Sequence, residues 1–267
     1  MARIAVGVEY QGSAWHGWQS QTAAPSVQQA LEAALGSVAN QPITLICAGR
    51  TDAGVHAVGQ VAHFDCAAVR STTAWLMGTN ANLPPDISLR WVREVPGHFH
   101  ARYSAESRTY RYWILNRRAR SALAASRALQ IFRPLNADAM AAAGSMLVGE
   151  HDFSAFRASE CQARSPVQRV SSLRVQRSAE WITVEVTANA FLQHMVRNIV
   201  GLLLAVGRGD APPDRAREQL ESRHRPAGEA TAAAHGLYFW HVQYPAAFGL
   251  GADSAIIGDL ACPWMFG

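Results

Sequence analysis

The feature that most constrains the fold is an order of strand and helix patterns that occurs twice along the chain. Alternating apolar residues predict strands, and apolar residues spaced three and four apart predict amphipathic helices. Both halves of the sequence read as β-α-β-β-α-β, although their residues differ. This is the order of the ferredoxin-like, or split βαβ, unit. The chain is therefore expected to contain two α+β halves.

In the first half, strands are expected at 4–10, on both sides of a loop at 49–56, and at 87–95, with helices at 26–40 and 72–83. In the second half, strands are expected at 108–116 and 236–244, a hairpin at 167–189, and helices at 136–149 and 190–207. We divide the chain into an N-terminal half, 1–103, and a C-terminal half, 104–267. We expect their sheets to join into one mixed, mainly antiparallel central sheet. Helices should lie on one side of it, with a basic cleft between the halves.

Charge is unevenly distributed along the chain. Residues 100–177 contain thirteen arginines and only five acidic residues, with Tyr103, Tyr110, Tyr112 and Trp113 among them. Arginines mixed with aromatic side chains favour a phosphate-rich partner with unpaired bases. A solvated surface is the alternative that a charged run most often represents.

Several classes of site are disfavoured by the composition. The chain has no lysine, which excludes a Schiff base, a P-loop lysine and a Ser-Lys pair. Its four cysteines are scattered, and the H-x-H of His98 and His100 has no further ligand at metal-binding spacing, so no metal is expected. No signal peptide opens the sequence, and the apolar run 199–207 is too short to span a membrane. We expect a cytoplasmic protein.

The loop at 49–56 carries the strongest chemical signal. Arg50 and Asp52 stand two residues apart between Gly49 and Gly54. An aspartate in such a turn is most often a turn former. An arginine on the same side of an extended loop would instead hold the carboxylate ionised, as a nucleophile or a general base requires.

Four segments together resemble the tRNA pseudouridine synthase A family: GRTDAGVHAVGQVAHF, FHARYSAESRTYRYWILN, GEHDFSAFR and NAFLQHMVRNIVG. The resemblance runs from about Val6 to Tyr244. It implies an isomerase that converts uridine to pseudouridine in the tRNA anticodon stem-loop, at tRNA positions 38, 39 and 40. It further implies that no cofactor or metal is needed and that the protein is a homodimer with tRNA as its partner.

The resemblance also assigns roles to single residues. Asp52 matches the catalytic aspartate, which attacks C1′ of the ribose or C6 of the uracil, or removes the 2′ proton. Arg50 matches the arginine that orients this carboxylate and helps to hold the nucleotide out of the stack. Tyr110 matches the tyrosine that stacks on the target uracil, and Arg197 a second ion-pair partner of the aspartate. Leu237 matches an apolar residue that packs against the target base.

Other residues receive weaker assignments. Six arginines are candidate phosphate contacts, namely Arg102, Arg108, Arg111, Arg157, Arg164 and Arg169, and we place Arg102 and Arg164 with the substrate-binding residues. His56 and His63 are expected to be structural, because the implied reaction needs neither as a base. Two alternatives stay open: an inactive RNA-binding or tRNA-chaperoning module on the same scaffold, and an aspartate-dependent glycosidase of small nucleosides.

Overall fold

The computed structural model describes residues 1–225 and 228–250 of the chain. It divides into two compact units, of which the first is Met1–Glu106 with the chain from Tyr238 onward and the second is Ser107–Leu237. The boundary expected after residue 103 left the closing strand in the second half, whereas the compact units place it, from Tyr238, in the first. The division into two domains stays a prediction.

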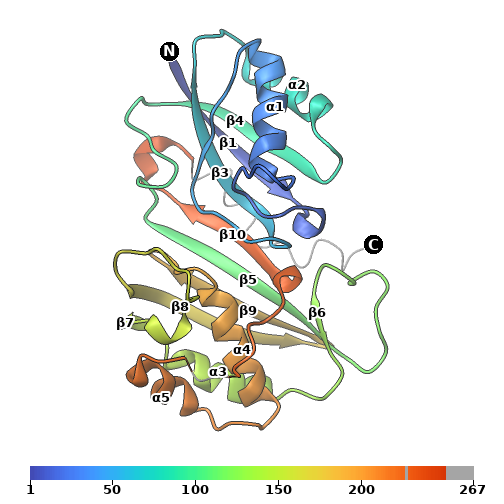
Figure 1. The fold of residues 1–267 in the computed structure, drawn as a ribbon, viewed down its shortest axis with the longest axis vertical. Coiled ribbons are helices and arrows are strands. Elements are labelled where there is room, and N and C mark those ends of the chain that lie inside the picture. The colour runs from blue at the N-terminus through green and yellow to red at the C-terminus, as the bar shows by residue number, and fades with distance from the viewer. Residues whose placement is uncertain (226–227, 251–267) are drawn as a thin grey trace. The chain divides into compact units, whose positions relative to one another are not determined.

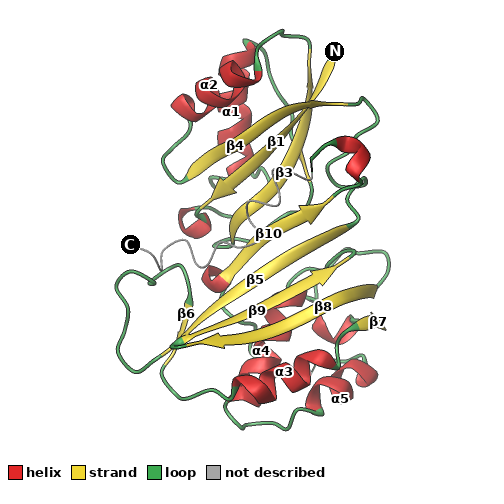
Figure 2. Cartoon of the chain, turned by 180° about the vertical axis from the view of Figure 1, so that it is seen from behind, coloured by secondary structure: helices red, strands yellow, loops and turns green. Residues whose placement is uncertain are grey.

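The first unit is built on a sheet in which β4, β1, β3 and β10 follow one another, with the short β2 beside β3. β1 is antiparallel to both of its neighbours, and β10 is parallel to β3, so the sheet is mixed. Two helices cover one face of it (Figure 1), and the view from behind shows the strands in front of them (Figure 2). The elements are β1 (Ala2–Tyr10), α1 (Val27–Ala39), β2 (Ile46–Cys47), β3 (His56–Cys66), α2 (Thr72–Asn82), β4 (Ile87–Val95) and β10 (Leu237–Gln243).

Helix α1 begins and ends at residues that the sequence marks. The Ser26 hydroxyl accepts the N–H of Gln29 at 3.3 Å, as an N-cap does. Asn40 ends the helix in the left-handed conformation, with φ +55°. Leu31 and Leu35 are fully buried on its inner face, so the helix packs onto the sheet along one apolar stripe.

The strand expected before the loop is shorter than its apolar run. Only Ile46–Cys47 forms β2, pairing with β3 over two positions. Just before it, the Leu45 N–H donates to the Glu32 carboxylate of α1 at 2.8 Å. The backbone here bonds to a helix side chain instead of a second strand, which is why the ladder stays short.

The second unit contains a sheet in which β5, β9, β8 and β7 follow one another, with β6 parallel to β5. The pairs of β5 with β9, β9 with β8, and β8 with β7 are antiparallel. Helices α3, α4 and α5 cover one face of this sheet (Figure 1). The elements are β5 (Ser107–Asn116), β6 (Leu129–Ile131), α3 (Ala137–Ser145), β7 (Gly149–Asp152), β8 (Val167–Ser178), β9 (Trp181–Ala188), α4 (Met195–Gly207) and α5 (Arg215–Ser222).

Helix α4 begins later than the expected start at residue 190. It starts at Met195, after His194 in the left-handed conformation with φ +61°. The preceding chain bonds elsewhere: the Asn189 amide donates to the Arg169 carbonyl at 3.2 Å, and the Gln193 carbonyl accepts the N–H of Ala158 at 2.9 Å. These bonds and the turn at 193–194 keep the segment out of the helix, so its apolar residues pack without forming helix.

A polar stripe of α4, formed by Arg197, Asn198 and Gly201, is covered by the segment 229–233. Asn198 is buried, donates to the Phe156 carbonyl at 2.7 Å and accepts the Thr231 hydroxyl at 2.8 Å. A Cβ on Gly201 would lie 2.1 Å from the Ala230 carbonyl oxygen. Small and amide side chains on this stripe therefore let a loop lie directly against the helix.

The expected α+β class and mainly antiparallel sheet are confirmed, and in each unit the helices lie on one face. The hairpin at 167–189 forms as β8 and β9, turning at Ala179, which has positive φ. None of the helices within the described residues is both long and apolar enough to cross a membrane. The cleft expected between the halves stays a prediction.

Candidate functional site

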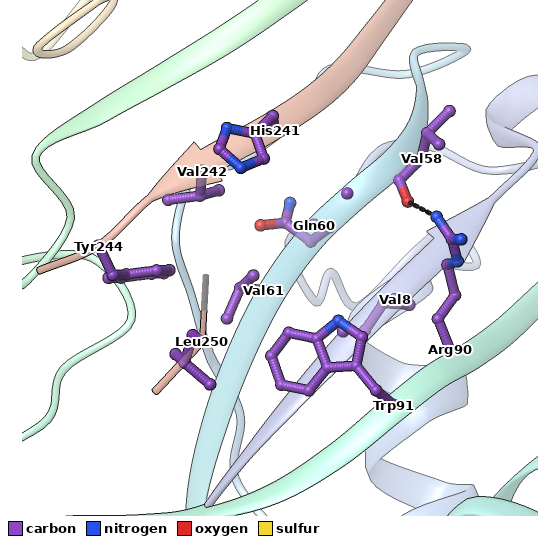
Figure 3. Close-up of a pocket in the computed structure, with 12 residues that line it drawn as sticks. Val8, Val58, Gln60, Val61, Arg90, Trp91, His241, Val242, Tyr244 and Leu250 are labelled. Carbon is purple, nitrogen blue, oxygen red and sulfur yellow. Dashed lines mark hydrogen bonds between the residues drawn. The ribbon is translucent and has the colours of Figure 1, made fainter. Parts of the chain in front are cut away.

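The cavity shown in Figure 3 lies in the first unit and is too small for a nucleotide. Val61, Trp91, His241 and Leu250 are among its lining residues. Its volume of about 20 Å³ holds about one water molecule. None of its lining residues comes from the loop 49–55. It is a small cavity between side chains of the sheet, separate from the loop that carries Asp52.

The Asp52 loop, residues 49–55, connects β2 to β3 and is closed by its own backbone. The Val55 N–H donates to the Asp52 carbonyl at 3.1 Å, and Gly54 between them has φ +77°, which favours glycine. The Gln60 amide of β3 donates to the Gly49 carbonyl at 2.7 Å. The loop therefore presents Asp52, which is partly exposed, on a fixed turn.

A second segment, residues 10–18, holds this loop; we name it the clamp segment. The Trp18 N–H donates to the Thr51 carbonyl at 3.0 Å, and the Gly54 N–H donates to the Trp15 carbonyl at 3.2 Å. The Tyr10 and Thr51 hydroxyls share a buried hydrogen bond of 2.8 Å. The residue next to Asp52 is thus fixed through both its backbone and its side chain.

Two glycines let the clamp segment approach the loop backbone. A Cβ on Gly12 would lie 2.0 Å from the Val55 carbonyl oxygen. Gly17 has φ +90°, and a Cβ there would lie 2.5 Å from the Thr51 carbonyl oxygen and 3.0 Å from the carbonyl carbon of Asp52. The sequence shows both glycines shortly after a strand, which is a signal for a close approach of the backbone. It does not show which backbone approaches, and so it does not connect these glycines with the Asp52 loop.

The two histidines near the loop are buried inside the first unit. His56 Nδ1 accepts the Gly12 N–H at 3.0 Å, and its ring stacks on Tyr238 with centroids 4.6 Å apart. His63 Nδ1 accepts the Ala101 N–H at 3.1 Å. Burial lowers the pKa of His63 to about 4. Both rings act as acceptors for backbone amides, as residues that hold a structure do.

Arg50 and Arg102 are exposed in the first unit and lie near the same thiol. Burial raises the pKa of Cys47 to about 12, and the charges of Arg50 and Arg102 oppose this rise. The charges of both guanidinium groups therefore reach Cys47 in β2. This concentration of positive charge next to the Asp52 loop suits a phosphate group.

In the second unit, β5 presents two tyrosines to the same side because they alternate along the strand. Tyr110 is mostly buried and meets the edge of Phe191, with centroids 4.8 Å apart. Tyr112 is fully buried and donates its hydroxyl to the Ala233 carbonyl at 2.7 Å. A Cβ on Gly236 would lie 2.5 Å from the Tyr112 ring.

Arg197 on α4 is tied to the segment that leads into β10. Its Nε donates to the Ala232 carbonyl at 2.8 Å, and its own carbonyl accepts the Ala232 N–H at 3.1 Å. Its charge also opposes the burial that raises the pKa of Tyr112 and adds to the burial that lowers the pKa of His235. The second unit thus brings Arg197 beside Tyr112 and the residues just before Leu237, which is buried.

The tyrosine hydroxyl at position 112 should contribute to stability. In Tyr112→Phe the Ala233 carbonyl loses its donor, which costs ~1 kcal/mol. We expect the free energy of unfolding in urea to fall by that amount. Tyr103→Phe is the matched control, because the Tyr103 side chain is 76% exposed. Equal unfolding midpoints for the two variants would contradict this role.

Residues 100–177, the basic block, include several arginines that bond within the fold. Arg111 forms a partly buried ion pair with Glu185 at 2.6 Å. Arg177 donates to the Leu135 carbonyl at 2.8 Å, and Arg108 to the Asn189 carbonyl at 2.8 Å. Whether Arg108 and Arg111 also contact phosphate stays a prediction. Arg164 and Arg169, in contrast, are exposed.

The predicted site residues are distributed over both units. Arg50, Asp52 and Arg102 lie in the first, and Tyr110, Arg164, Arg197 and Leu237 in the second. Their meeting in one active site stays a prediction. As for metals, the described residues contain no group of three or more histidine, cysteine, aspartate or glutamate side chains placed to hold an ion.

Comparisons with known proteins agree with the resemblance. A family model described as tRNA pseudouridine synthase matches residues 6–104 and 143–245. The tRNA pseudouridine synthase A of Nitrosococcus oceani is 53% identical over 248 residues, which cover 93% of this chain and 96% of that protein. The protein of the same name from Pseudomonas aeruginosa is 52% identical over 251 residues, covering 94% of this chain and 88% of that protein. The chain therefore belongs to the tRNA pseudouridine synthase family.

Proposed function

We propose that this member of the family isomerises uridine to pseudouridine in the tRNA anticodon stem-loop, at tRNA positions 38, 39 and 40, with Asp52 as the catalytic carboxylate. The observation that carries the proposal is the way the Asp52 loop is held. Backbone bonds from Trp18 and Gly54, and the buried Tyr10–Thr51 hydrogen bond, fix the residues around this aspartate. An enzyme fixes a reacting group in this way to save the entropy of positioning it. We further infer a homodimer that acts in the cytoplasm.

The reaction is an exchange of bonds within one nucleotide. The bond between uracil N1 and C1′ breaks, the uracil turns, and C5 forms the new bond to C1′. The C5 proton is lost to water and N1 gains a proton, so no oxidant, reductant or co-substrate is consumed. An ionised carboxylate can carry out each of three possible first steps: attack on C1′, attack on C6, or removal of the 2′ proton.

Other side chains have roles that their chemistry suits. A nucleotide inside a stem must leave the stack before C1′ is accessible. Arg50, which is exposed in the Asp52 loop, has a planar guanidinium that can hold a displaced nucleotide and orient the carboxylate. Tyr110 would stack on the uracil, Leu237 would pack against it, and Arg197 would be a second partner of Asp52. Arg102 and Arg164 are exposed and suited to phosphate groups.

The test is incubation with an unmodified tRNA transcript that carries tritium at uracil C5. Isomerisation releases tritium to water in step with pseudouridine formation, and mapping of the product should place it at positions 38, 39 or 40. An inactive RNA-binding module would bind the transcript and release no tritium. A nucleoside glycosidase would release free uracil instead. Pseudouridine elsewhere in the tRNA would contradict the proposed positions while supporting the reaction.

Affinity for tRNA should fall steeply with salt, because arginine–phosphate contacts release counterions. Replacing Arg164 with glutamine should flatten the slope of log K against log salt by about 0.7–0.9 if it contacts one phosphate. The matched control is Arg215→Gln, since Arg215 is already paired with Glu218 and Glu229. Filter binding between low and physiological salt measures both slopes. An Arg164 slope that stays the same as that of the wild-type protein would remove this residue from the binding surface.

A further inference from the structure

Tyr103 is an aromatic side chain that the fold leaves in solvent. Its side chain is 76% exposed, whereas Tyr110 and Tyr112 are buried. It lies in the turn 100–104 of the first unit, just after β4 and Phe99. Isolated exposed apolar residues are common, so exposure alone says little. The construction of the turn around Tyr103 says more.

The turn is closed by reciprocal hydrogen bonds. The His100 N–H donates to the Ser104 hydroxyl at 2.9 Å, and the Ser104 N–H donates to the His100 carbonyl at 2.9 Å. Inside it, His100 Nδ1 accepts the N–H groups of Arg102 and Tyr103 at 3.1 and 3.2 Å. The amides at the tip are therefore satisfied by one imidazole, and the Tyr103 ring is directed outward by a rigid turn.

The Tyr103 ring rests on a stack that continues into the core. It lies over the His100 ring with centroids 4.3 Å apart and planes 30° apart. The His100 ring in turn meets His63 at 4.9 Å, and the buried His63 meets the edge of Phe99 at 5.8 Å. Burial and the charge of Arg3 lower the pKa of both histidines, and both rings accept backbone N–H groups at an unprotonated Nδ1.

Positive charge lies beside this stack. The Arg102 guanidinium carbon is 5.6 Å from the centre of the Tyr103 ring, within the range of a cation–π contact. Arg50 and Arg102 also act on the same thiol, Cys47. A supported aromatic ring with a guanidinium group next to it is the combination that binds single-stranded nucleic acid, with a base on the ring and a phosphate on the arginine.

We propose that Tyr103 is a stacking surface for an unpaired base of the tRNA substrate, with Arg102 holding a phosphate of the same strand. The proposal rests on the proposed function, because it assigns a contact to that substrate. It adds a binding residue on the surface of the first unit, distinct from the buried tyrosines of β5. A base adjoining the target becomes unstacked when the target nucleotide leaves the helix, and it would gain a new partner here.

The experiment compares the binding of an unmodified tRNA transcript by wild-type protein, Tyr103→Ala, Tyr103→Trp and Arg102→Gln at several salt concentrations. Loss of one stacked base should weaken binding by Tyr103→Ala about 5- to 100-fold without changing the salt slope. Tyr103→Trp should bind as well as the wild-type protein. Arg102→Gln should flatten the slope by about 0.7–0.9. Met77→Ala, on the exposed side of α2 and 63% exposed, is the control and should bind normally.

Two measurements separate stacking from a structural role. Thermal unfolding and sedimentation should show the same stability and oligomeric state for Tyr103→Ala as for wild-type protein. A less stable or dissociated Tyr103→Ala, or one whose salt slope falls, would overturn the stacking role. If wild-type protein binds tRNA and Tyr103→Ala binds it within about twofold, the inference alone fails. If wild-type protein does not bind tRNA, the proposed function fails and the inference with it.

Discussion

Asp52→Asn protein should form pseudouridine at least about 10³-fold more slowly than wild-type protein while binding tRNA within about threefold. The substitution replaces one carboxylate oxygen with an amide group and keeps the shape of the side chain. It removes the charge and the basicity that all three routes require. The loop should keep its position, because the bonds that hold it use the Thr51 side chain and the backbone of Thr51 and Gly54.

Tritium release under single-turnover conditions measures the chemical step, and filter binding measures the affinity. Asp138→Asn is a suitable control, since Asp138 is exposed in the first turn of α3, outside the Asp52 loop. Turnover by Asp52→Asn above a tenth of the wild-type rate would remove Asp52 from the chemistry. Lost binding by the same variant would instead show that the carboxylate holds the tRNA.

Much of the fold could be predicted because local chemistry and tertiary packing agree. Ser26 caps α1 as its sequence position indicates, and the period-two pattern of 167–189 forms the hairpin of β8 and β9. Predictions were wrong where an apolar run had another partner. Leu45 bonds to Glu32 of α1, which shortens β2. The chain before Met195 bonds to other strands and loops, which delays α4.

The Asp52 loop could be found from sequence because its residues are adjacent in the chain. The clamp segment could not, because its contacts join residues about forty positions apart, such as Tyr10 and Thr51. The same limit explains the arginines. Composition shows a basic block, but only the fold shows that Arg111 is paired with Glu185 across two strands. Tyr103 also looks like Tyr110 and Tyr112 in sequence, although its burial is the opposite.

Gly17 lies in the clamp segment, and Gly17→Ala should lower kcat for tRNA about 100-fold and leave KM nearly unchanged. Gly17 has φ +90°, and a Cβ there would lie 2.5 Å from the Thr51 carbonyl oxygen and 3.0 Å from the carbonyl carbon of Asp52. Because both neighbours are backbone atoms, no side chain can rotate away. The loop must shift, and a displacement of about 1 Å in a reacting group costs about 10²-fold in rate.

The matched control is Gly97→Ala, in the same unit. A Cβ on Gly97 meets nothing within 4 Å, and its φ is not positive, so activity should stay normal. Because Gly17 has positive φ, alanine at this position should also lower the free energy of unfolding by about 1–2 kcal/mol. Urea denaturation therefore accompanies the kinetics, and assays are run where both variants are fully folded.

If folded Gly17→Ala protein turns over tRNA at the wild-type kcat, contact with the clamp segment does not set the position of Asp52. If instead KM rises while kcat is unchanged, the clamp segment acts on tRNA binding and not on the carboxylate.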